Sequence, residues 1–325
     1  MLYYKREVHF FSSVRKMLRV HHNQNRSFFA VEKRDDADLP SIDWGRADML
    51  IELALNEDLD TVGDVTTNSI IPEDMESRAV LRCKSDATVI AGLAIAERVF
   101  KLVEPRLEFK SFVEDGELCN KGDEIAAVEG PVRGILTGER TALNFLQRLS
   151  GIATTTNRYA KVLEGSKTEL LDTRKTTPGY RNLEKYAVAV GGGSNHRMGL
   201  FDRVMIKDNH REIAAAGGGE NAISWAVEQA RKKYPELEIE VEADTIDEAA
   251  QAAAAGVEYI LLDNMTNEEM AEAVKVIAGR AKTEASGGIT IERLAEIAKI
   301  GVDFVSSGAL THSVKSADIS LDIEI

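Results

Sequence analysis

Cysteine is nearly absent from this chain of 325 residues, which contains only Cys83 and Cys119. Two cysteines are too few for a disulfide framework or a four-ligand zinc site, and they favour a reducing, cytoplasmic setting. Long apolar runs are also missing. A membrane-spanning helix needs about 18 or more consecutive apolar residues, and no segment provides them, so we expect no membrane span.

Basic residues are in the minority. Lysine and arginine number 40 against 54 aspartate and glutamate residues, which gives a formal net charge of −14. Nonspecific nucleic-acid binding requires a basic face that displaces counterions from phosphates, so no nucleic-acid partner is expected. Apolar residues make up 44% of the chain and charged residues 29%, a composition typical of a globular protein and not of collagen, a coiled coil or a disordered chain.

Residues 1–40 differ in composition from the rest. The first thirty contain one acid, Glu7, among several lysines and arginines. A transit peptide is also basic and poor in acids, but serine is sparse here and no cleavage signal is evident. A secretory signal needs an uninterrupted apolar core, which this segment lacks. We therefore favour a disordered extension over a targeting segment and assign it no chemistry.

The remaining chain is expected to form two domains. Residues 41–136 predict a small α+β domain that opens with a helix around Trp44 to Asn56. Its expected strands are Ala79–Cys83, Val89–Ile90, Leu107–Val113 and Glu124–Val128, separated by glycines. Residues 137–325 alternate long helices with short apolar strands, which predicts an α/β barrel. The extreme C-terminus is expected to pack back on the N-terminal domain.

Six expected strands of residues 137–325 each end in a polar group. They are Glu169–Leu171 before Asp172 and Thr173, Arg203–Ile206 before Lys207, Glu238–Val241 before Glu242, Val257–Leu262 before Asp263, Lys282–Ala285 before Ser286, and Val302–Val305 before Ser306 and Ser307. In an α/β barrel the carboxyl ends of the strands form the active-site face, so these groups predict an active site there. Ordinary solvated strand ends are the alternative.

Cations concentrate in one part of this region. Between Asp172 and Arg211 eight basic residues face four acids, a local charge of +4. Arg174 and Lys175 follow a strand directly, and Arg197 follows a glycine loop and His196. A guanidinium binds a carboxylate or phosphate through two hydrogen bonds, so these residues and Lys207 predict a site for a small polyanion. Each of them taken alone is equally explained as a surface or structural residue.

Glu242 and Asp263 end consecutive strands, so their carboxylates are expected to lie close together. Such oxygens suit Mg²⁺ bridged to a phosphate, or they accept hydrogen bonds from sugar hydroxyls. Pairing with nearby cations is the structural alternative.

Two glycine turns follow the last two strands. They are Ser286-Gly287-Gly288, which leads into a helix near Thr290, and Ser307-Gly308-Ala309. Backbone N–H groups at such turns bind phosphate. The residues together predict a polyanion, a phosphate-bearing sugar and a divalent metal as ligands. No catalytic triad, dinucleotide fingerprint or P-loop is present.

Several of these motifs resemble those of the quinolinate phosphoribosyltransferase family, from about Trp44 to the C-terminus. The motifs are Gly138–Asn144, Leu149–Thr154, Asp172–Arg181, Asn195–Arg197, Ile206–His210 and Leu262–Asn264. The resemblance implies a type II phosphoribosyltransferase-like α/β barrel with a smaller N-terminal α+β domain. It also implies the reaction, in which quinolinate and phosphoribosyl pyrophosphate give nicotinate mononucleotide, pyrophosphate and CO₂ in de novo NAD synthesis, with Mg²⁺ required.

The resemblance further implies residue roles. The acceptor's carboxylates would be bound by cations matching Arg140, Arg174, His196, Arg197 and Lys207, next to Thr173. Lys175 would be catalytic, near both substrates. Glu242 and Asp263 would act on the ribose hydroxyls and on the metal, directly or through the donor pyrophosphate. The turns Ser286, Gly287, Gly288 and Ser307, Gly308, Ala309 would bind the 5′-phosphate.

A homodimer with shared active sites, or a higher oligomer built from it, is also implied, because in this family the group matching Arg140 reaches the partner's barrel. Rival interpretations are a related transferase that uses nicotinate or another aromatic acid, a relative linked to molybdenum transport operons, another phosphate-binding barrel enzyme such as an isomerase or lyase, and a non-catalytic binding protein on the same fold.

Overall fold

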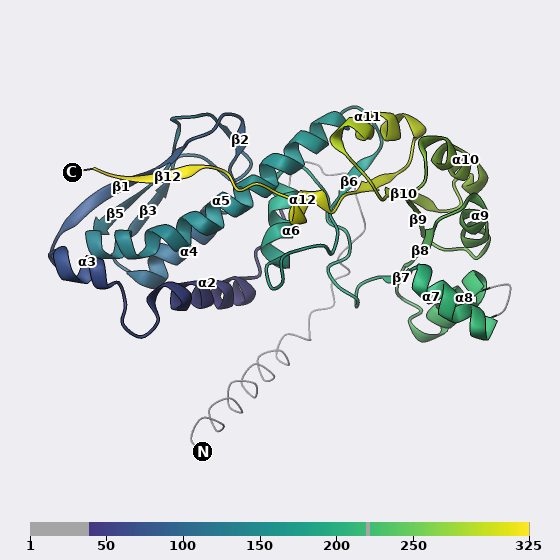
Figure 1. Ribbon diagram of the computed structural model, residues 1–325, viewed down its shortest axis with the longest axis horizontal. Coiled ribbons are helices and arrows are strands. Elements are labelled where there is room, and N and C mark those ends of the chain that lie inside the picture. The colour runs from purple at the N-terminus through teal and green to yellow at the C-terminus, as the bar shows by residue number, and fades with distance from the viewer. Residues whose placement is uncertain (1–38, 219–221, 325) are drawn as a thin grey trace, which may run out of the picture. The chain divides into compact units, whose positions relative to one another are not determined.

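The computed structural model describes residues 39–218 and 222–324 (Figure 1). The basic N-terminal extension lies almost entirely outside these residues, so its expected disorder stays a prediction. Within the described ranges, no helix is both long enough and apolar enough to cross a bilayer.

The N-terminal part of the chain builds an antiparallel sheet with strand order β12-β1-β5-β3. Its strands are β1 (Glu76–Cys83), β3 (Glu108–Ser111), β5 (Glu124–Pro131) and β12 (Ile319–Glu324), and a separate two-stranded sheet joins β2 (Thr88–Val89) to β4 (Leu118–Cys119). The C-terminal strand β12 pairs along β1, with Ala79 opposite Ile323. The end of the chain therefore adds a strand to a sheet that otherwise comes from residues before position 132.

Four helices accompany these strands: α2 (Trp44–Leu59), α3 (Val65–Ile70), α4 (Leu93–Val103) and α5 (Val132–Val162). The side chain of Asp43 accepts the Arg46 N–H and begins α2, as an aspartate N-cap does. Helix α5 is 31 residues long and buries Ile135, Leu146 and Leu149 against the rest of the core. The boundary expected after Leu136 falls inside this helix, and the division into two domains stays a prediction.

A parallel sheet follows, with strand order β6-β11-β10-β9-β8-β7. Its strands are β6 (Glu169–Leu171), β7 (Val204–Ile206), β8 (Ile239–Ala243), β9 (Tyr259–Asp263), β10 (Lys282–Ser286) and β11 (Phe304–Ser306). Its helices are α6 (Arg181–Val190), α7 (Asp208–Gly218), α8 (Ala222–Lys233), α9 (Ile246–Ala254), α10 (Asn267–Ile277), α11 (Ile291–Ile300) and α12 (Ala309–His312). The six predicted strands are all present, and the expected α/β class with a smaller N-terminal α+β part is confirmed.

All neighbouring strands of this sheet run parallel, so their carboxyl ends meet at one edge. On the outer side of β6, its last residue, Leu171, makes an isolated parallel bridge with Ser194. Across the described residues, no ladder joins β7 back to β6. Two helices that follow strand ends start with capping boxes, Thr245 with Glu248 for α9 and Thr266 with Glu269 for α10. These reciprocal hydrogen bonds fix where the chain turns back from the edge.

Gly151 of α5 touches the segment that leads to β12. A Cβ atom there would overlap the backbone oxygen of Lys315 and lie 3.0 Å from Cα of Ser316. We predict that Gly151→Ala destabilises the protein by about 1–3 kcal/mol through overpacking, although alanine is the better helix former. Urea unfolding measures this. The control is Gly45→Ala, where the nearest atom would be Asp43 Oδ1 at 3.5 Å; equal effects of both substitutions would refute the close approach.

Candidate active site

The carboxyl edge of the parallel sheet collects most of the residues selected from the sequence. Asp172 and Thr173 follow β6, Lys207 follows β7, and Ser307 follows β11. The strands β8, β9 and β10 carry Glu242, Asp263 and Ser286 at or near their last positions. Asp263 and Ser286 lie directly opposite each other in the ladder, and the Ser307 N–H donates to the Leu171 carbonyl at the end of β6.

Glu242 and Asp263 form a close acidic pair at this edge. Burial and the neighbouring Glu242 carboxylate raise the pKa of Asp263, while a hydrogen bond from Ser286 opposes the rise. Glu242 is 7% exposed, and its Oε2 accepts from Lys207 Nζ at 2.7 Å. The pair therefore provides oxygen ligands for a hard cation or acceptors for hydroxyl groups, with Lys207 as its present counter-charge.

The loop between β6 and α6 is held by Glu184, which the sequence analysis missed. This fully buried carboxylate accepts the N–H and the hydroxyl of Thr177, at 3.1 and 2.8 Å. Arg148 of α5 pairs with it at 2.7 Å and donates to the Thr311 carbonyl. The available signal was a glutamate on the apolar face of α6, where Leu183 and Val188 are also buried.

A second buried carboxylate, Asp172, joins this loop to the segment after α6. Lys185 Nζ donates to Asp172 Oδ1 and also to the His196 carbonyl. The His196 N–H and the Asn195 side-chain amide donate to the same carboxylate. Burial raises the pKa of Asp172 and lowers that of Lys185, against their mutual attraction. Each of the two groups therefore stays charged only while the other is beside it.

Arg174 and Arg197 are neighbouring cations. Burial and the Arg174 charge lower the pKa of Arg197. Arg197 Nη1 donates to the Arg203 carbonyl at 3.2 Å, while the Nε of Arg174 is buried and finds no acceptor among the described residues. Two close guanidinium groups, one of them with a spare donor, favour a ligand that carries more than one negative charge.

His196 belongs to the segment after α6 and is buried, at 5% exposed. Its Nε2 is 3.2 Å from Glu240 Oε2 and 3.4 Å from Glu284 Oε2. Burial disfavours the charged ring, but the two carboxylates outweigh burial and raise the pKa of His196 to about 10. Neither glutamate is recognisable as a functional residue from the sequence, where the only signal is an acid within each expected strand.

The two glycine turns make close approaches. Gly287 has φ of +81°, and a Cβ there would overlap the Asn264 side chain at the end of β9. A Cβ at Gly308 would lie 2.8 Å from Cδ of Lys175, so the Lys175 side chain lies against the turn after β11. Thr311 also donates to the Lys175 carbonyl at 2.7 Å. Lys175 and the Ser307–Ala309 turn thus belong to one cluster.

Arg140 is separate from the residues above. It is exposed on α5, and within the described part of the chain it makes no ion pair or hydrogen bond with any of them.

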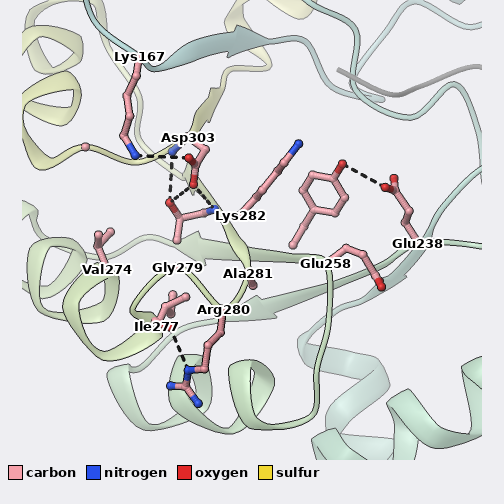
Figure 2. A pocket seen from close by; sticks show the side chains of 13 residues that line it. Lys167, Glu238, Glu258, Val274, Ile277, Gly279, Arg280, Ala281, Lys282 and Asp303 are labelled. Atoms are coloured by element: carbon pink, nitrogen blue, oxygen red, sulfur yellow. Dashed lines mark hydrogen bonds and ion pairs between the residues drawn. The ribbon is translucent and has the colours of Figure 1, made fainter. Parts of the chain in front are cut away.

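The opposite edge of the sheet carries a hollow of about 410 Å³ (Figure 2). Figure 2 shows Glu238, Lys282 and Asp303 around it, at or before the first residues of β8, β10 and β11. Acids and bases of this hollow largely neutralise one another, as in the Lys167–Asp303 pair at 3.4 Å. None of the residues selected from the sequence lines it.

We predict that Asp172→Asn lowers the free energy of unfolding by about 3–5 kcal/mol, because it leaves Lys185 charged and buried without its counter-ion. Denaturant unfolding monitored by circular dichroism measures this. Lys275→Gln is the control: it breaks a pair whose side chains are 73% and 51% exposed, and such a pair contributes at most about 1 kcal/mol. An Asp172→Asn effect as small as the control's would contradict the anchoring role.

Curated proteins similar to this chain come from plants and bacteria. Quinolinate phosphoribosyltransferase [decarboxylating] 1b of Nicotiana tabacum is 44% identical over 290 residues, which cover 85% of this chain and 81% of that protein. The chloroplastic nicotinate-nucleotide pyrophosphorylase [carboxylating] of Arabidopsis thaliana is 46% identical, with 85% and 82% covered. The probable enzyme of that name in Bacillus subtilis is 44% identical over 270 residues, with 83% and 90% covered.

These relatives contradict the expected cytoplasmic location. The Arabidopsis protein is described as chloroplastic, and one of the Nicotiana tabacum proteins as mitochondrial. The expectation was wrong because scarce cysteine excludes only a disulfide scaffold and does not distinguish one reducing compartment from another.

Solved structures agree in fold. The nicotinate-nucleotide pyrophosphorylase of Francisella tularensis superposes with a TM-score of 0.82 at 38% identity and covers 89% of this chain and 100% of that one. NadC of Streptococcus pyogenes gives a TM-score of 0.81 at 41% identity, with 88% and 100% covered. Human nicotinic acid phosphoribosyltransferase, at 13% identity and a TM-score of 0.57, shares the fold alone.

Two family descriptions match consecutive parts of the chain. Residues 64–150 match the N-terminal domain of quinolinate phosphoribosyl transferase, and residues 152–322 match its C-terminal domain. The resemblance seen in the sequence motifs is thereby confirmed, and the chain belongs to the quinolinate phosphoribosyltransferase family.

Proposed function

We propose that this chain transfers the phosphoribosyl group of phosphoribosyl pyrophosphate to the ring nitrogen of quinolinate, with loss of one carboxylate as CO₂. The products are nicotinate mononucleotide and pyrophosphate, and the reaction is a step of de novo NAD synthesis. One observation carries the proposal beyond family membership. The neighbouring cations Arg174 and Arg197 and the acidic pair Glu242 and Asp263 gather around one parallel sheet. Arg174 follows β6 and Arg197 contacts Met205 of β7, while the acids lie at the ends of β8 and β9.

The acceptor subsite consists of the cations. Quinolinate carries two carboxylates, and the close pair of Arg174 and Arg197 offers a charge and a fork of donors to each of them. Thr173, His196 and Lys207 complete this subsite in the proposal. Lys207 is 45% exposed and pairs with Glu242, so it is placed between the acceptor subsite and the acids.

The donor subsite consists of the acids and the turns. Glu242 and Asp263 accept hydrogen bonds from ribose hydroxyls, and Ser286, Gly287 and Gly288 present backbone N–H groups to the 5′-phosphate. The second turn, Ser307 to Ala309, lies against Lys175 and brings a cation to the same phosphate region.

Mg²⁺ fits this arrangement. Burial and the neighbouring Glu242 carboxylate raise the pKa of Asp263, so the two form an acidic pair whose repulsion a divalent cation would relieve, and carboxylate oxygens are the preferred ligands of such a cation. These two residues would hold the ion, directly or through the donor. When bound, it neutralises charge on the leaving pyrophosphate.

The reaction follows from this placement. The ring nitrogen forms a bond to the anomeric carbon while the bond to pyrophosphate breaks, and positive charge develops on the ribose. Glu242 and Asp263, held at fixed positions by the strand ends, stabilise that charge. The ring nitrogen of the adduct is cationic, so the adjacent carboxylate leaves as CO₂ and its electron pair stays on the carbon beside the positive charge. That carbon then takes up a proton, and no further cofactor is needed.

The site is completed by a second copy of the chain in this proposal, through Arg140. On α5, Thr137 and Thr141 lie near Arg140 and donate hydrogen bonds to Asp64, the N-cap of α3, and to Asp58 in the last turn of α2. That part of the surface exposes large apolar side chains, namely Leu53, Val62, Val65 and Ile70, each at least 60% exposed. Arg140 therefore stands beside an apolar surface suited to a protein interface.

The first test follows product formation from quinolinate, phosphoribosyl pyrophosphate and Mg²⁺, with nicotinate in a parallel reaction. We expect nicotinate mononucleotide and CO₂ in equal amounts from quinolinate, and loss of both after chelation of Mg²⁺. Product from nicotinate alone would move the chain to a different transferase, and activity that survives chelation would remove the metal from the proposal.

The second test concerns the shared site. Arg140→Ala and Lys175→Ala are each expected to be inactive or nearly so with quinolinate. Mixing the two after subunit exchange should restore about a quarter of the wild-type activity, because half of the dimers combine both chains and each of these holds one intact site. An activity that stays at the level of the single variants would place Arg140 in its own subunit's site and overturn the shared arrangement.

A further inference from the structure

Two buried glutamates lie directly beneath the proposed site. Glu240 precedes Glu242 by two residues on β8, and Glu284 precedes Ser286 by two residues on β10. Side chains two apart on a strand point to the same face, so each glutamate lies one step deeper than a residue of the site. Strand β9 lies between their two strands and pairs Tyr259 with Glu240 and Leu261 with Glu284.

Neither glutamate reaches solvent. Both are 0% exposed, and Oε1 of Glu240 and both oxygens of Glu284 have no hydrogen-bond partner in the described chain. Their charged neighbours are His196, which enters from the segment after α6, and Arg203, whose Nη1 is 3.4 Å from Glu240 Oε2. Two adjacent buried carboxylates are unfavourable for stability, so their presence points to another role.

The cluster continues to Arg197. Its backbone N–H donates to His196 Nδ1 at 2.6 Å, which leaves Nε2 as the ring nitrogen that faces the two carboxylates. The guanidinium of Arg197 donates to the carbonyl of Arg203, and the guanidinium of Arg203 pairs with Glu240. The contacts form a closed ring from Glu240 through His196, Arg197 and Arg203 back to Glu240.

We propose that Glu240 and Glu284 are positioning residues, which hold the imidazole of His196 and thereby set the orientation of Arg197 toward the carboxylates of the acceptor. They touch neither substrate. The inference rests on the proposed acceptor subsite, in which Arg197 binds quinolinate. It assigns to the two glutamates control of the affinity for quinolinate, separate from binding of the donor and from the chemical step.

The test uses Glu240→Gln and Glu284→Gln, which keep the shape of each side chain and remove its charge. We expect the KM for quinolinate to rise by about ten-fold or more, while kcat and the KM for phosphoribosyl pyrophosphate change by less than about two-fold. Glu258→Gln is the matched control. Glu258 directly precedes β9, is 35% exposed, pairs with Arg231 at 2.6 Å and lines the hollow at the opposite edge (Figure 2). All three kinetic constants should be unchanged in the control.

Arg197→Lys distinguishes a misassigned acceptor subsite from a wrong positioning role. If it leaves the KM for quinolinate unchanged, the acceptor subsite itself is misassigned. If it raises that KM but the glutamine variants do not, the positioning role is wrong. Combining Arg197→Lys with Glu284→Gln should add little to either change alone, because both act on one guanidinium.

A purely structural role would give a different result. It would raise both KM values or lower kcat together with the unfolding midpoint, and that outcome overturns the proposal. If one glutamine variant fails to fold, the KM values of the other variant alone test the positioning role. If both fail, Arg203→Lys interrupts the same ring at a third point, and the same selective rise in the KM for quinolinate is expected.

Discussion

The ion pair between Asp172 and Lys185 is the interaction on which the arrangement of the site depends. Its carboxylate stands at the end of β6 and binds the backbone and side chains of the segment that follows α6. Two loops that both carry cations are thus fastened to a single buried group. This buried charge opposes the repulsion between Arg174 and Arg197, and Arg181 joins the same two loops by donating to the carbonyls of Arg174 and Met198.

That repulsion is useful for recognition. The chain carries an excess of acids, yet its cations converge where burial strengthens their field. Burial and the nearby Arg174 charge destabilise the charged form of Arg197, as its lowered pKa indicates. In the proposed site, an anion with two carboxylates offsets the repulsion between the two guanidinium groups. The acidic pair Glu242 and Asp263, on neighbouring strands of the same sheet, favours a cation or hydroxyl groups instead of an anion. In the proposed site the two groups of residues select ligands of complementary charge, and each group makes an incorrectly oriented ligand unfavourable.

Much of this could be predicted from the sequence, because short apolar strands between capped helices fix the strand ends and the residues just beyond them. The strand positions of β6 to β11 and the places of Lys207, Glu242 and Asp263 follow from that pattern alone. Glu240 and Glu284 could not be found in this way. An acid that alternates with apolar residues normally marks a solvent-facing side of a strand, and only the complete fold shows that both faces are covered. The Arg148–Glu184 pair was missed for a different reason: its two residues are on different helices and 36 positions apart in sequence.

The pairing of β12 with β1 has a consequence for biosynthesis. A ribosome releases the chain from its N-terminus, so β1, β3 and β5 emerge long before their fourth strand does. Until β12 has been made, one edge of β1 stays unpaired and presents N–H and C=O groups to any neighbouring strand. Completion of the sheet therefore requires the closure of a large loop, and long-range strand pairing of this kind is slow. The N-terminal sheet thus takes its strands from two parts of the chain that are far apart in sequence.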